Sequence, residues 1–140
     1  MTIRMISLAA AGLVLFAGAA SAASAHHPAA KAPSLGGDPA KGRTVFTQQC
    51  SLCHSAKAGE EGQGPSLFGV VGRKAGSEPG FPAYTKALKT LNVTWAPTSL
   101  DKFLAAPTAM APGTAMPIAL PNPQERHNVV AYLASLKKGS

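Results

Sequence analysis

The only two cysteines of this 140-residue chain lie three positions apart in the stretch "QQCSLCH", and a histidine follows the second directly. Cys50, Cys53 and His54 therefore suggest a disulfide, a redox dithiol, part of a zinc site or an attachment point for a cofactor. A disulfide at this separation closes almost no loop and gains little stability. A redox dithiol normally lies in a strand–helix–strand unit, which the flanking pattern does not predict. A zinc site needs four ligands, and there is no second pair of cysteines.

The spacing Cys-x-x-Cys-His is also the motif of covalent haem attachment, and this is the interpretation that remains. Two cysteines at this spacing can form thioethers to the two vinyl groups of one haem c. The adjacent imidazole of His54 can then reach the iron from one face. We therefore predict a single haem, attached through Cys50 and Cys53.

The sixth position of the iron requires a second ligand, and Met116 is the best candidate. It lies in the proline-dense stretch "APGTAMP", where a rigid backbone lowers the entropy cost of holding a weak thioether ligand. Gly113 permits a tight reversal before it, and Thr114 offers a hydroxyl group to fix that reversal. Met110 has no such glycine and is expected to be packed or partly exposed. A histidine–methionine pair raises a haem potential towards the range of electron carriers. The other histidines are His26, His27 and His127.

The first 25 residues have the pattern of a secretory signal peptide. Arg4 supplies a positive charge, residues 6–19 are apolar, and small residues precede possible cleavage points after Ala22 or Ala25. The alternative is an uncleaved segment that tethers the protein to a membrane. We predict an exported, periplasmic protein with a flexible lead-in over residues 26–36 and one folded domain over residues 37–138.

Helix signals are strongest at the two ends of that domain. Asp38 and Pro39 predict the start of a first helix, with the aspartate as N-cap and the proline at the first helical position. Asn122 and Pro123 predict the start of the last helix in the same way. We therefore expect these two helices to form the clearest secondary structure of the chain.

Two shorter helices are expected between them, one near residues 84–91 and one after Thr98, with Asp101 completing a capping box. The segments 59–82 and 106–123 are rich in glycine and proline and are predicted to be long loops. Loops this long are uncommon in a compact domain unless they bind something. A domain this small also has a thin apolar core. A large apolar cofactor enclosed by the loops explains both features.

The chain carries a net charge of +7, from 13 basic and 6 acidic residues. The basic residues are scattered and form no run, which argues against nucleic-acid binding. A basic surface that meets an acidic protein or an anionic membrane fits better.

The chain resembles a class I cytochrome c of the mitochondrial type and its bacterial relatives, over residues 37–137. The resemblance is carried, in the family's order, by "GDPAKGRTVF", "CSLCH", "GPSLFGVVGRKAG", "PAYT", "VTW", "DKFLAAP", "PGTAM" and "HNVVAYL". It implies an all-α, small single-domain fold, with helices and long loops wrapped around one covalent haem. It also implies a one-electron carrier and not an enzyme, acting as a monomer that meets membrane-bound or periplasmic redox proteins transiently.

The resemblance also assigns roles to single residues. Cys50 and Cys53 would carry the thioethers, and His54 and Met116 would be the two iron ligands. The Pro65 carbonyl would accept a hydrogen bond from the His54 ring. The haem propionates would accept hydrogen bonds from Arg73, Tyr84 and Trp95. Thr114 would help to orient the methionine loop. Gly42 and Phe46 would pack the first helix against the last near Tyr132.

Some positions depart from the family pattern. Phe103 replaces a tyrosine near the methionine ligand, and Ile118 replaces an aromatic residue at the haem edge. Lysines that surround this edge in mitochondrial relatives are replaced by uncharged residues at Gln49, Thr108, Ala109 and Ala115. Two alternatives to a soluble carrier remain open from sequence: a haem enzyme or gas-binding cytochrome with an open sixth position, and a membrane-tethered cytochrome subunit.

Overall fold

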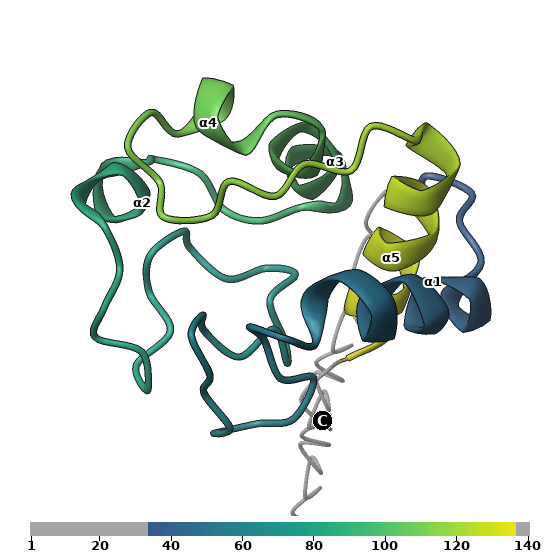
Figure 1. Cartoon of the computed structure of the whole chain (residues 1–140), viewed down its shortest axis with the longest axis horizontal. Helices are drawn as coiled ribbons and strands as arrows, with labels where there is room; N and C mark the ends of the chain where they lie inside the picture. The colour runs from purple at the N-terminus through teal and green to yellow at the C-terminus, as the bar shows by residue number, and fades with distance from the viewer. Residues whose placement is uncertain (1–33, 137–140) are drawn as a thin grey trace, which may run out of the picture.

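The computed structural model describes residues 34–136, which form an all-α arrangement of short helices joined by long loops (Figure 1). The predicted signal peptide, its cleavage points after Ala22 or Ala25, and most of the lead-in lie outside the described residues. Within this range the only strand-like pairing is an isolated bridge between Lys74 and Thr94. The elements in chain order are α1 (Pro39–Val45), the π-helical turn η1 (Phe46–Cys50), α2 (Lys86–Thr90), α3 (Pro97–Ala105), α4 (Pro107–Met110) and α5 (Pro123–Ser135).

The predicted starts of the first and last helices are confirmed. The Asp38 carboxylate accepts hydrogen bonds from the backbone N–H groups of Ala40 and Lys41, and Pro39 occupies the first position of α1. The Asn122 side chain caps α5 in the same way. These caps satisfy N–H groups that have no partner within the helix.

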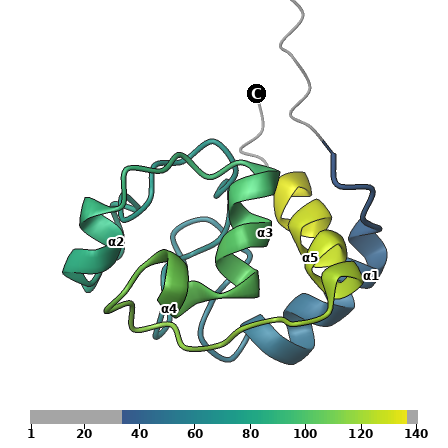
Figure 2. The ribbon, with the colours of Figure 1, turned by 90° about the horizontal axis from the view of Figure 1, so that it is seen from above.

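Helices α1 and α5 pack against each other at one end of the molecule, and α2 lies at the other end with α3 between them (Figures 1 and 2). Gly42 makes the close approach possible, because a Cβ atom there would collide with the Asn128 carbonyl and lie 2.8 Å from the Tyr132 Cβ. The rings of Phe46 and Tyr132 contact each other at a tilt of 57°, with centroids 5.4 Å apart. The predicted contact of the first and last helices is therefore confirmed.

The predicted capping of the third helix is wrong in detail. Helix α3 begins at Pro97 and not after Thr98, and it is the Ser99 hydroxyl that accepts the N–H of Ala96, at 2.8 Å. Asp101 has another role: it accepts a hydrogen bond from Arg126 Nε at 2.8 Å and so ties α3 to α5. The proline starts the helix early because its fixed φ suits the first helical position.

Three further features differ from the sequence-based expectations. The first helix continues as η1, which carries the chain as far as Cys50. The second predicted loop contains α4, a single turn that begins at Pro107. Leu35, which lies in the lead-in predicted to be flexible, is partly buried and packs against the core.

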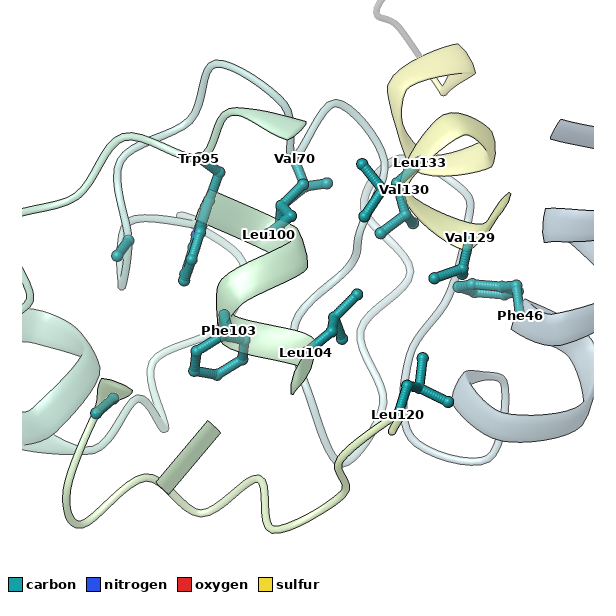
Figure 3. Close-up of a cluster of buried hydrophobic side chains, with 12 residues drawn as sticks. Phe46, Val70, Trp95, Leu100, Phe103, Leu104, Leu120, Val129, Val130 and Leu133 are labelled. Atoms are coloured by element: carbon teal, nitrogen blue, oxygen red, sulfur yellow. The ribbon is translucent and has the colours of Figure 1, made fainter. Parts of the chain in front are cut away.

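The buried apolar residues come from η1, the two long loops, the segment before α3, and helices α3 and α5. Figure 3 shows the core side chains of α3 and α5, together with Phe46, Val70 and Leu120, gathered in one region. The core also contains the ring pair of Trp95 and Phe103, whose centroids are 5.1 Å apart. Within residues 34–136, no helix has the length and apolar character needed to cross a membrane.

Replacing Gly42 with alanine should destabilise the folded protein, because the new methyl group must displace the backbone of α5 or the Tyr132 side chain. We expect a loss of about 1–3 kcal/mol in the free energy of unfolding, as for other overpacked sites. Denaturant unfolding of the purified protein measures it. Thr44→Ala, at an exposed position of the same helix, is the control and should change stability little. Equal stability of the two variants would contradict this account of the helix contact.

Candidate functional site

The cysteine motif forms a tight turn at the end of η1. The backbone N–H groups of Cys53 and His54 both donate to the Cys50 carbonyl, at 3.0 and 2.9 Å. Burial, with the nearby Cys53 adding to the effect, raises the pKa of the Cys50 thiol to about 11. The Cys50 thiol therefore stays protonated at neutral pH, unlike the low-pKa nucleophile of a redox dithiol.

The His54 ring is held in one orientation by its surroundings. Its Nδ1 atom lies 2.7 Å from the Pro65 carbonyl oxygen, which can only accept a hydrogen bond. Nδ1 must therefore carry the ring proton, and Nε2 keeps a lone pair for a metal. Gly64 lies against the ring, and a Cβ at this position would be 2.7 Å from Nδ1. Only a glycine fits here without moving the imidazole.

A cavity of about 290 Å³ lies beside this ring, and all nine of the predicted cofactor-binding residues line it. Most of its other lining residues are apolar. Eight of the twelve buried apolar core residues also border it, from Val70 in the first long loop to Leu133 in α5. The nine predicted residues are Cys50, Cys53, His54, Pro65, Arg73, Tyr84, Trp95, Thr114 and Met116.

The two candidate methionines have different surroundings. Met116 lines the cavity, and its backbone N–H donates to the Thr114 hydroxyl at 3.2 Å. Gly113, with φ of +88°, makes the reversal before it. Met110 lies at the end of α4, is partly buried against the core, and is not part of the cavity lining.

Arg73, Tyr84 and Trp95 form the more polar wall of the cavity. The Arg73 guanidinium pairs with Glu78 and donates to the Ser66 carbonyl at 2.7 Å. Burial lowers the pKa of Arg73, while Tyr84 and Glu61 oppose that shift. Burial raises the pKa of Tyr84, so its hydroxyl stays protonated and can donate a hydrogen bond into the cavity. These groups suit anionic substituents of a ligand, which need partners when they leave water.

One polar group of the site was missed by sequence reasoning. Thr85 is the residue before α2, but its hydroxyl makes no capping bond. Thr85 lines the cavity, and its Oγ1 atom is buried without a hydrogen-bond partner among residues 34–136. A buried hydroxyl without a partner is unfavourable unless a ligand supplies one. Its only signal in the sequence was its position after Tyr84, which also fits an ordinary N-cap.

Comparison with known proteins agrees with this geometry. Residues 39–137 match the family described as Cytochrome c. The chain belongs to the cytochrome c family. Cytochrome c2 of Rhodomicrobium vannielii is 48% identical over 101 residues, which cover 71% of this chain and 79% of that protein. Cytochrome c2 of Rhodopila globiformis is 42% identical over 102 residues, which cover 72% of this chain and 95% of that protein. Cytochrome c of Euglena viridis is 38% identical over 102 residues, which cover 72% of this chain and 99% of that protein.

Membership of this family confirms the predicted fold class, the cofactor and the main function. This cytochrome carries one haem c, attached through Cys50 and Cys53, and acts as a one-electron carrier. The described residues fit that group: the cavity is largely apolar, two cysteines lie in its wall, and the lining residue Thr85 has a buried hydroxyl with no partner within residues 34–136.

Folding should require the cofactor, because a cavity in the middle of a thin core is costly when nothing fills it. Eight of the twelve buried core residues border this cavity, so without the cofactor they lose their packing on that side, which is a large loss for a small domain of marginal stability. The double variant Cys50→Ala, Cys53→Ala should therefore be largely unfolded and sensitive to protease. Circular dichroism measures the helix content.

Leu52→Ala is a matched control for this variant, since Leu52 lies between the two cysteines and is 83% exposed. It should keep both the haem and the native helix content. Native helicity in the haem-free double variant would show that the remaining core folds alone.

Proposed function

We propose that this cytochrome shuttles single electrons in the periplasm between membrane-bound or soluble redox proteins, with His54 and Met116 as the two axial ligands of the iron. The observation that carries the assignment is the cavity lining, which includes His54 and Met116 but not Met110. Haem c supplies one-electron exchange between two oxidation states of its iron. With both axial positions filled by side chains, no position would remain for a substrate, which favours a carrier over an enzyme.

The residues around the site would support this role by keeping the ligands in place. The Pro65 carbonyl holds the His54 proton on Nδ1, so the imidazole would present Nε2 in one fixed orientation. Thr114 and Gly113 shape the turn that carries Met116. Rigid ligands lower the reorganisation that accompanies electron transfer. Arg73, Tyr84, Trp95 and Thr85 would bind the polar substituents of the cofactor.

Met116→Ala should lower the midpoint potential, because the reduced iron loses its soft thioether ligand. The same change should let carbon monoxide bind the reduced protein at neutral pH. Met110→Leu is the matched control and should do neither. A redox titration and a visible spectrum under carbon monoxide test both variants. A lower potential in Met110→Leu, with an unchanged one in Met116→Ala, would reverse the ligand assignment.

The exposed part of the cavity lining, which we call the rim, carries no charged side chain among the described residues. It consists of Gln49, Gln63, Ala83, Ala115, Pro117 and Ile118. The Ile118 side chain is 51% exposed and is one of two large apolar residues so exposed between residues 34 and 136. We propose that partners meet this uncharged rim in small, transient contacts, as is common for redox encounters.

Electron transfer to the membrane fraction of the host should therefore slow only modestly as ionic strength rises, since salt screens exposed charges and leaves apolar contacts intact. Ile118→Ser should lower the bimolecular rate more than Leu52→Ser does. Stopped-flow kinetics at low and physiological salt measure both. A steep loss of rate over this range would show that charge, and not the rim, governs docking.

A further inference from the structure

Glu61 makes a hydrogen bond that connects it to the His54 ring through a single peptide group. Its Oε2 atom accepts the backbone N–H of Ser66 at 2.5 Å, and Ser66 is 1% exposed. That N–H belongs to the peptide joining Pro65 to Ser66. The carbonyl of the same peptide accepts the Nδ1–H of His54 at 2.7 Å. A carboxylate, a peptide and an imidazole therefore form one continuous hydrogen-bonded chain.

Hydrogen bonds in such a chain strengthen one another, since each polarises the group it shares with the next. A negative charge on the N–H side of a peptide increases the electron density on its carbonyl oxygen. The Pro65 carbonyl thus becomes a stronger acceptor for Nδ1–H. A stronger acceptor at Nδ1 makes the imidazole more basic at Nε2 and so a better electron donor.

The Glu61 charge is available for this role. Its Oε1 atom is buried and has no hydrogen-bond partner within residues 34–136. The nearby cation, Arg73, pairs with Glu78 and donates to the Ser66 carbonyl. The carboxylate is also held in position, because it packs against Gly80, where a Cβ would lie 2.8 Å from Oε1. With Oε2 on the Ser66 N–H and Oε1 buried against Gly80, the carboxylate stays directed at that peptide.

We propose that Glu61 is a positioning residue that acts through the Pro65–Ser66 peptide on His54, fixing its tautomer and strengthening it as a donor. A more basic ligand favours the oxidised iron, so Glu61 holds the midpoint potential below the value that His54 and Met116 alone would set. The inference rests on the proposed role of His54 as an iron ligand.

The test compares Glu61→Gln with Glu60→Gln in the haem-loaded protein. Glutamine keeps the size of the side chain and an oxygen for the Ser66 N–H but removes the charge. Glu60 is the matched control: it is the neighbouring acid, its side chain is 54% exposed, and it bonds to Ser55 and Lys57 but not to the Pro65–Ser66 peptide. Midpoint potential and the proton resonance of His54 Nδ1–H in the reduced protein are the two readouts.

Glu61→Gln should shift the potential to more positive values and move the Nδ1–H resonance upfield, as its hydrogen bond weakens. Glu60→Gln should move the Nδ1–H resonance little, and it should shift the potential by less than Glu61→Gln does. Equal shifts in the two variants would overturn the inference, since a charge effect without the peptide chain would then suffice.

A measurement on the unmodified protein keeps the inference testable should Glu61→Gln fail to fold. A scalar coupling across the hydrogen bond between the Glu61 carboxylate carbon and the Ser66 amide nitrogen should be detectable by NMR. Its absence would overturn the inference. A failure of the proposed function is distinguishable from a failure of this inference. If His54 were not an iron ligand, the His54→Ala variant would keep the wild-type potential, while the Glu61–Ser66 coupling would persist.

Discussion

The central cavity is the constraint on which the rest of this structure depends. Most of the buried apolar side chains border it, so they would pack against the cofactor as well as against one another. The contact of α1 with α5, closed by Gly42 and the Phe46–Tyr132 ring pair, is built from protein alone. The cofactor is therefore part of the core, which explains how a domain with such short helices and long loops can hold a fixed shape.

The polar groups of the site form two hydrogen-bond networks that meet at Ser66. One runs from His54 through the Pro65–Ser66 peptide to Glu61, and the other joins Arg73 to Glu78 and to the Ser66 carbonyl. Ser66 is thus bonded on both sides of its backbone while remaining buried. The two networks give partners to buried backbone groups that would be costly without them.

Local signals in the sequence predicted much of the fold and the site. Asp38 and Asn122 each precede a proline, and both cap a helix in the structure because capping depends only on the nearest residues. The Cys-x-x-Cys-His motif indicated the cofactor for a similar reason, since its chemistry is contained in five consecutive positions. The predicted capping of α3 was wrong because two local signals competed: Thr98 and Asp101 fit a capping box, but Pro97 and Ser99 start the helix earlier.

The sequence by itself determined the covalent attachment, the starts of the first and last helices and the preference for Met116 over Met110. Only the tertiary structure decided which other groups meet in space: it directs Asp101 to Arg126 on another helix and leaves the Thr85 hydroxyl buried without a partner among the described residues. It also brings Glu61 onto the peptide that binds His54. The physical reason is that hydrogen bonds and burial depend on distances in space, and a loop of glycine and proline residues does not reveal in its sequence which of its side chains will face inwards.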